Sequence, residues 1–233
     1  MLVKTFGAAV QGIHATTITI EVNVSQGIRF MLVGLPDNAI KESHERIVSA
    51  IQFCGMKFPH QQVVINMAPA DIRKEGAAYD LPLAIGILAA SGAVLNEELS
   101  DYIIMGELSL DGTLHPIKGI LPIAIKAREE GFKGLIIPKE NAKEAAVVNN
   151  LDVYGANCLL EVINFFNKKG SIEKTIIDTR KEFFEQLNNF EMDFNSQNNI
   201  QKIHFDFDVH NYILAQNLVY YFSFLLTLKL IQE

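Results

Sequence analysis

Residue types that could support chemistry gather in two places in this sequence. The first is the loop from Arg73 to Asp80, where Gly76 precedes an apolar helical stretch. Backbone N–H groups at a helix N-terminus can hold a phosphate. The second is HFDFDVH, which places His204, Asp206, Asp208 and His210 on one face of an expected strand. Two histidines and two carboxylates on one face raise the question of a bound metal ion.

The loop lacks further features of a phosphate site, and residues 204–210 lack those of a metal site. The loop has a single glycine and no Ser or Thr before the helix, and Asp80 at the helix start repels an anion. We therefore expect a tight turn into a buried helix. Side chains that alternate along one strand point in parallel and do not converge, so residues 204–210 are expected to form a solvated edge strand. The histidines show no metal-ligand spacing, and no metal is expected.

The composition is that of a soluble globular protein. The chain has 233 residues, of which 49% are apolar, enough for one substantial core plus an appendage. Its formal charge of -7 argues against a chain-wide DNA or RNA surface, because phosphate binding needs clustered Lys and Arg. Four basic residues could form a local patch, although solvated surface charges are the better interpretation: Lys41, Arg46, Arg73 and Lys74.

Cysteine usage and the N-terminus indicate the cellular compartment. Cys54 and Cys158 lie far apart in the sequence and next to apolar residues, so we expect two reduced core cysteines. The first ten residues contain one Lys and no sustained apolar run, which is unlike a signal peptide. A cytoplasmic location is therefore expected.

The elements that must position these residues begin with strands. Runs rich in β-branched residues predict three strands, Leu2–Val10, Thr16–Val24 and Ile28–Val33, joined as an antiparallel meander. A helix follows, with Asp37 as its N-cap and Gly55 in the C′ role at its end. Its apolar positions keep to one face, so we expect it to pack on the sheet.

The second half of the chain alternates strands and helices. Asp80 is predicted to cap a helix over Leu81–Ser91, which is apolar on nearly every side and so deeply buried. This order argues for an α+β (mixed α/β) domain. Strands are predicted at Gln62–Met67, Tyr102–Gly106, Glu107–Leu110, Leu135–Ile137 and Val153, a hairpin turn at Asp111-Gly112, and helices at Gly119–Glu130, Lys139–Val148 and Leu159–Phe166.

Three long motifs carry a resemblance to a known family. They are VGLPDNAIKESHERI from residue 33, INMAPADIRKEGAAYDLPLAIGILAASG from residue 65, and GELSLDGTLHPIKGILPIAIKAREEGFKGLIIPKENAKEA from residue 106. With these motifs, residues 1–194 resemble the N-terminal domain of the ComM/YifB family, the magnesium-chelatase-related AAA+ proteins. The third motif also resembles the proteolytic domain of the Lon proteases. The resemblance implies a two-layer, ribosomal protein S5 domain 2-like fold in residues 1–168, a connector in 169–194 and a divergent tail in 195–233.

The resemblance also indicates where a catalytic dyad would be. In Lon proteases the loop matching Glu75–Ala78 ends in the nucleophilic serine, and a catalytic lysine follows the Pro-Ile-x-Gly step. This chain has Ala78 and Leu121 at these positions, and a Ser/Lys dyad needs a hydroxyl and an amine. Ser91 and Lys118 are the nearest substitutes, but Ser91 lies roughly 15 Å along its helix from the loop. We therefore expect no enzyme activity.

The resemblance places the nucleotide site elsewhere. No P-loop, G-x-x-x-x-G-K-[ST], occurs in the sequence, so ATP and Mg are expected only for the missing AAA+ module, and no cofactor is expected here. After Phe194 the likeness stops. The uninterrupted apolar run Leu218–Leu228 is about half of the roughly 20 residues that a membrane-spanning helix needs. A truncated or frameshifted end is therefore favoured over a membrane anchor.

The expected function is a non-catalytic assembly or substrate-contact domain of a ComM/YifB-type AAA+ protein. The family is linked to DNA processing in natural transformation. Expected partners are other copies of the chain or an AAA+ partner, with DNA contacted through the full-length protein. Two alternatives stay open, a residual Lon-like serine peptidase and a DNA-binding module that uses Arg73 and Lys74. The candidate contact loop consists of Arg73, Lys74, Glu75, Gly76 and Asp80.

Overall fold

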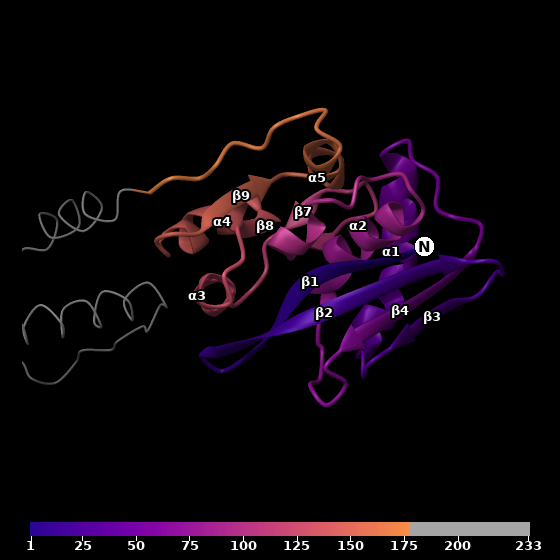
Figure 1. Ribbon diagram of the computed structural model, residues 1–233, viewed down its shortest axis with the longest axis horizontal. Coiled ribbons are helices and arrows are strands. Elements are labelled where there is room, and N and C mark those ends of the chain that lie inside the picture. The colour runs from indigo at the N-terminus through magenta and orange to yellow at the C-terminus, as the bar shows by residue number, and fades with distance from the viewer. Residues whose placement is uncertain (178–233) are drawn as a thin grey trace, which may run out of the picture. The chain divides into compact units, whose positions relative to one another are not determined.

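A seven-stranded sheet organises residues 1–177, which are the residues that the computed structural model describes (Figure 1). β1 pairs antiparallel with β2, which pairs antiparallel with β4, and the other neighbours are parallel. The strands, in their order across the sheet, are β3 (Phe30–Val33), β4 (Gln62–Ala68), β2 (His14–Ser25), β1 (Leu2–Gln11), β5 (Tyr102–Ile104), β8 (Gly134–Pro138) and β9 (Asp152–Ala156).

The predicted antiparallel meander is wrong in its third strand. β3 forms within the predicted range, but it pairs in parallel with β4 at the edge of the sheet and not with β2. Helix α1 (Asn38–Phe53) connects β3 to β4. Parallel neighbours need such a crossover connection, so the helix between the two strands determines their order.

Helix α1 begins and ends at the predicted residues. The Asp37 carboxylate accepts the Ile40 N–H at 2.9 Å, and Gly55 follows the helix with a φ of 73°. Ile47 and Ile51 are fully buried, so the predicted apolar face packs into the core. α1 contacts the next helix, α2 (Asp80–Ala90), and Figure 1 shows both beside the sheet.

Helix α2 is the centre of the core. All of its residues are buried, as predicted, and the ideal Cβ position of Gly86 lies 2.7 Å from a Val22 methyl group. The predicted N-cap is wrong. A short 3₁₀ turn, η1 (Ala77–Tyr79), precedes the helix, Tyr79 occupies the cap position, and Asp80 is the first helical residue. The Asp80 side chain instead forms an ion pair with Arg46.

Helices cover both faces of the second half of the sheet. Successive residues of β9 point to opposite faces. The Cβ position at Gly155 lies against Ala142 of α4, whereas the Tyr154 ring lies 5.1 Å from the Phe165 ring of α5. The predicted α+β, mixed α/β fold class is confirmed. The remaining elements are η2 (Leu99–Asp101), α3 (Ile120–Glu129), α4 (Lys139–Ala146) and α5 (Leu159–Phe166).

Residues 107–110 do not continue the sheet, contrary to prediction. β6 (Glu107–Leu108) and β7 (Leu114–His115) form a separate two-stranded ribbon, with Asp111 and Gly112 in its turn. The cause is Gly106, whose N–H donates to the Ala78 carbonyl and whose carbonyl accepts the Leu81 N–H. These bonds tie the chain to η1 and α2 directly after β5.

The predictions for the connector beyond Ile177 and for the tail lie outside the described residues. They include the edge strand at 204–210 and the apolar run at 218–228. Within residues 1–177, the structure has no helix that combines the length and the apolar character needed to cross a membrane. These residues form one compact unit, Met1–Ile177.

Candidate functional site

The loop between β4 and α2 is held by the residues that start α1. The Asp37 N–H donates to the Lys74 carbonyl at 3.2 Å, and Pro36 forms a parallel bridge with Lys74. The second carboxylate oxygen of Asp37 accepts the Gly76 N–H at 2.9 Å. One carboxylate therefore fixes both the first turn of α1 and the backbone of the loop.

Two of the five predicted contact residues face inward. The Lys74 ammonium donates to the Pro69 carbonyl, and burial lowers the pKa of Lys74. Asp80 is buried as well. Of the other three predicted residues, Arg73 and Glu75 form an exposed ion pair, whose Nε and Oε1 atoms lie 2.8 Å apart, and Gly76 is partly exposed. Only these three of the five predicted residues are available to a partner.

Asp80 makes a bidentate ion pair with Arg46. The Arg46 Nε and Nη2 atoms lie 2.7 and 3.0 Å from the two carboxylate oxygens, and Nη2 also donates to the Ala39 carbonyl. The Leu108 N–H donates to the same carboxylate at 3.3 Å. Burial raises the pKa of Asp80 against the opposing effect of Arg46, whose own pKa is raised by the hydrogen bond to Asp80. The cluster joins α1, α2 and β6.

This role of Arg46 was not predicted from the sequence, where a solvated surface charge was expected. The sequence carried a signal, because Arg46 lies three residues after Ser43 and four before Ala50, and both of these face the core. A cation at such a position needs a buried anion. The favoured interpretation as solvated surface charges is wrong for Arg46 and Lys74, which have internal partners, whereas Arg73 is exposed and pairs with Glu75, so a basic patch does not form from these residues.

The two positions of the lost dyad contribute only aliphatic side chains. Ala78 lies in η1, where its carbonyl accepts the Gly106 N–H at 2.8 Å. Leu121 is buried in the first turn of α3. The residues next to these two positions contact the same part of β1. The Tyr79 hydroxyl, next to Ala78, donates to the Ala8 carbonyl at 3.0 Å, and the Cβ position of Gly119, two residues before Leu121, faces Val10. The positions that the resemblance assigns to the dyad therefore carry neither a nucleophile nor an amine.

The nearest substitutes for the dyad do not rebuild it. The Ser91 hydroxyl follows the last turn of α2 and donates to the Leu88 carbonyl at 2.9 Å. Lys118 is exposed before α3. Neither side chain replaces the group lost at Ala78 or Leu121.

The β6–β7 ribbon holds a serine–histidine contact that was not predicted from the sequence. The Ser109 hydroxyl lies 2.5 Å from His115 Nε2. The nearby carboxylate of Asp111 accepts the Thr113 N–H, which lowers the pKa of Asp111 and leaves it turned toward the backbone. Within residues 1–177, the His115 ring donates no hydrogen bond to a carboxylate. The sequence signal was the position of Ser109 and His115 on either side of a hairpin turn.

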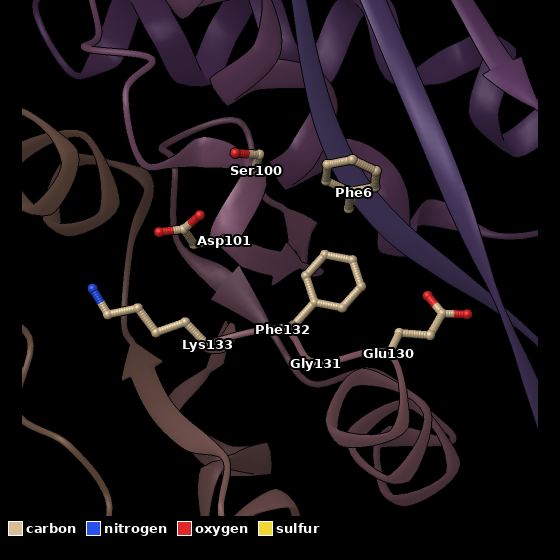
Figure 2. Close-up of a pocket in the computed structure, with 7 residues that line it drawn as sticks. All are labelled: Phe6, Ser100, Asp101, Glu130, Gly131, Phe132 and Lys133. Atoms are coloured by element: carbon tan, nitrogen blue, oxygen red, sulfur yellow. The ribbon is translucent and has the colours of Figure 1, made fainter.

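A hollow of about 320 Å³ lies apart from the loop, and Figure 2 shows its lining. The rings of Phe6 and Phe132 meet edge to face, with centroids 5.4 Å apart. Glu130 accepts the Thr17 hydroxyl at 2.6 Å and pairs with Lys126 at 3.0 Å. The carboxylates make the hollow unsuited to a phosphate. Its lining residues are Phe6, Ser100, Asp101, Glu130, Gly131, Phe132 and Lys133.

Metal and thiol chemistry also receive little support. Among the described residues, no group of three or more His, Cys, Asp or Glu side chains is arranged to hold a metal ion. Cys54 and Cys158 are free and half-buried, and burial raises the pKa of Cys54. A raised pKa disfavours the reactive thiolate.

The fold and the site define a class, a mixed α/β, Lon-like domain without the side chains of the Ser/Lys dyad. A family model described as subunit ChlI of Mg-chelatase matches residues 20–141, just over half of the chain. The chain belongs to this AAA+ ATPase-related family and, within it, to the ComM/YifB group.

Three relatives illustrate the match. The competence protein ComM of Haemophilus influenzae is 42% identical over 163 residues, 70% of this chain and 32% of that protein. The uncharacterized protein YifB of Escherichia coli is 38% identical over 167 residues, 71% of this chain and 33% of that protein. Lon protease 2 of Bacillus subtilis is 31% identical over 113 residues, 48% of this chain and 19% of that protein. The chain thus spans about a third of the length of its ComM and YifB relatives.

Proposed function

We propose that this chain is a non-catalytic assembly or substrate-contact domain of a ComM/YifB-type AAA+ protein. The observation that carries the proposal is the pair of aliphatic residues at the dyad positions. Ala78 has no hydroxyl to act as a nucleophile, and the buried Leu121 has no amine to take its proton. In this proposal the compact unit Met1–Ile177 acts by holding a partner.

We propose that the nucleotide chemistry belongs to a part of the protein outside this sequence. The 233 residues contain no P-loop, and the relatives are about three times longer than the part matched here. We propose that ATP and Mg bind in an AAA+ module, and that the protein works in the cytoplasm. DNA, in this proposal, is contacted by the full-length protein.

The test combines two binding measurements with one activity-based labelling. The purified chain is titrated with ATP and Mg in a calorimeter, treated with a serine-directed fluorophosphonate probe, and mixed with the ATPase module of a full-length relative. We expect no ATP binding, no covalent label, and association with the ATPase module that weakens in Arg73→Glu. Lys118→Glu, an exposed change outside the loop, serves as the control. Tight ATP binding by the chain would overturn the proposal.

A residual serine peptidase remains the second candidate because of the Ser109–His115 contact. This reading requires a covalent probe label that disappears in Ser109→Ala. A label that persists in Ser109→Ala but disappears in Ser91→Ala would support the peptidase with a different nucleophile. We expect neither, since His115 lacks an orienting carboxylate among the described residues.

A DNA-binding module is not favoured by the geometry. Of the basic residues proposed for it, Lys74 is buried and Arg73 is paired with Glu75. We expect any association with DNA to be unchanged in an Arg73→Glu variant at moderate salt. A steep salt dependence that the variant reduces would restore this candidate.

A further inference from the structure

The two edges of the sheet differ in their protection. At the β9 edge, the Thr175 N–H donates to the Val153 carbonyl at 2.8 Å, and Tyr154 forms a bridge with Lys174. At the other edge, β3 pairs only with β4 among the described residues. The strand reads Phe-Met-Leu-Val, without the charges or prolines that discourage pairing at an edge.

The open edge carries exposed apolar side chains. Ile28 is 94% exposed, Met31 45%, Val33 49% and Leu35 61%. Phe30, by contrast, points to the core side, where its ring lies 4.3 Å from the His44 ring. A row of exposed apolar residues on an unpaired strand is typical of an interaction surface.

The end of this strand is held in a strained shape. Leu35 has a φ of 55°, which is rare for a residue with a branched side chain. Gly34 before it packs so closely on β4 that a Cβ would lie 2.1 Å from the Met67 carbonyl oxygen. The Pro36–Lys74 bridge fixes the other side. The surroundings therefore keep Leu35 pointing outward at the cost of backbone strain.

The backbone of the edge selects the register of a second strand. The Val63 N–H donates to the Arg29 carbonyl, so Arg29, Met31 and Val33 direct their peptide groups to β4. The peptide groups of Phe30 and Leu32 consequently point outward. An antiparallel copy of β3 can exchange both hydrogen bonds between Phe30 and the other copy's Leu32. Met31 then lies opposite its own equivalent on a two-fold axis.

Charges near the edge complement each other in this register. Arg29 is exposed and lies opposite Val33 of the second copy. In that copy, the chain after Val33 is bridged to the contact loop through Pro36 and Lys74. The loop presents Glu75, which pairs with Arg73 within one copy but stays exposed, so it can also meet Arg29 of the second copy. The two-fold axis repeats each Arg29–Glu75 pair, which makes the surface self-complementary.

We propose that the β3 edge binds a second copy of this chain, pairing β3 with β3 in an antiparallel arrangement about Met31. This inference rests on the proposed assembly function and specifies its surface. Continuation of the sheet across two copies would bury the apolar row and satisfy the outward peptide groups of Phe30 and Leu32.

The sharpest test uses a single thiol at the two-fold axis. In the full chain with Cys54→Ser and Cys158→Ser, Met31→Cys is oxidised with diamide. Opposed residues at a position of this kind have Cα atoms about 4.5 Å apart, within the range of a disulfide. We expect a covalent dimer. Leu32→Cys, whose side chain lies on the core face of the same strand, is the matched control and should stay monomeric.

Sedimentation velocity of the cysteine-free chain gives an independent readout. Val33→Lys should abolish a concentration-dependent dimer, whereas Leu95→Lys, an equally apolar and exposed site away from the edge, should keep it. Arg29→Glu or Glu75→Arg alone should weaken the dimer about tenfold, and the two together should restore it.

Three outcomes would overturn the inference: a monomer at all concentrations, a dimer insensitive to Val33→Lys, or equal crosslinking of both cysteine variants. If the chain stays monomeric but binds the ATPase module, the dimer inference is wrong and the proposed function is still supported. Circular dichroism of each variant separates lost association from lost folding.

Discussion

Arg46 is the side chain on which the packing of three elements depends. Its guanidinium compensates the buried Asp80 carboxylate. We expect Arg46→Met to lower the free energy of unfolding by about 3 kcal/mol or more, because it leaves a buried charge without a partner. Urea unfolding followed by circular dichroism measures the loss.

A double variant separates the ion pair from the shape of the site. Arg46→Met with Asp80→Leu removes both charges and should recover most of the lost stability, except for the orphaned Leu108 N–H. If the double variant were as unstable as Arg46→Met, the loss would come from packing, and the account of the charge would be wrong.

Gly34 is the second residue whose identity the structure dictates. Its φ is 103°, and an added Cβ would lie 2.1 Å from the Met67 carbonyl oxygen. Gly34→Ala should therefore cost about 3 kcal/mol or more, from backbone strain plus a steric clash. Gly12→Ala is the matched control, because Gly12 has a φ of 62° with open space around it and should cost about 1 kcal/mol. Equal unfolding midpoints for the two variants would contradict the steric argument.

At the scale of elements, the β1–β2 hairpin is tied to the end of α3 through Glu130. Burial raises the pKa of this carboxyl, but hydrogen bonds from Thr17 and Lys126 lower it more, so the folded-state pKa falls below the ordinary 4.5. The stability from this group is present above the unfolded pKa and is lost as pH falls through the folded pKa.

Thr17→Val tests this connection. We expect the pKa of Glu130, followed by NMR, to move up toward its ordinary value. The stability difference from the parent should be present at neutral pH and vanish in acid below the folded pKa. Thr19→Val, two residues along the same face of β2, should leave the titration unchanged. An unaltered Glu130 titration in Thr17→Val would refute the role of this hydrogen bond.

Local patterns predicted the elements whose form depends on nearby residues. The Asp37 cap, the Gly55 end and the fully apolar α2 all follow from a few consecutive side chains. The order of β3 in the sheet depends on the crossover through α1. The departure of β6 depends on the hydrogen bonds that Gly106 makes with Ala78 of η1 and Leu81 of α2. Such long-range pairings leave no periodic trace in the sequence.

The candidate site shows the same division. The residue types at Ala78 and Leu121 were readable from the motifs alone. The burial of Lys74 and Asp80 was not, because it depends on partners 5 and 34 residues away in sequence. Because Lys74 and Asp80 are charged, they were expected to be exposed at the surface, as most lysines and aspartates are.

At the scale of the molecule, residues 1–177 contain the whole sheet and the segment that covers its β9 edge. A protein of residues 1–177 should therefore unfold in a single cooperative transition. Residues 1–168 alone lack Lys174 and Thr175, so they should unfold at lower denaturant and associate more readily through the bare edge. Unfolding and light scattering of the two proteins check this, and identical behaviour would show that the covering segment is dispensable.

The carboxylate of Asp37 gives the contact loop a mechanical consequence. One oxygen holds the first turn of α1 and the other holds Gly76, while Arg46 on the same helix grips the first residue of α2. A force applied at the loop by any bound molecule passes through a rigid helix to the most deeply buried part of the protein. The contact loop is therefore mechanically coupled to the core through α1. Removing the Asp37 carboxylate would uncouple a molecule bound at the loop from the buried helix α2.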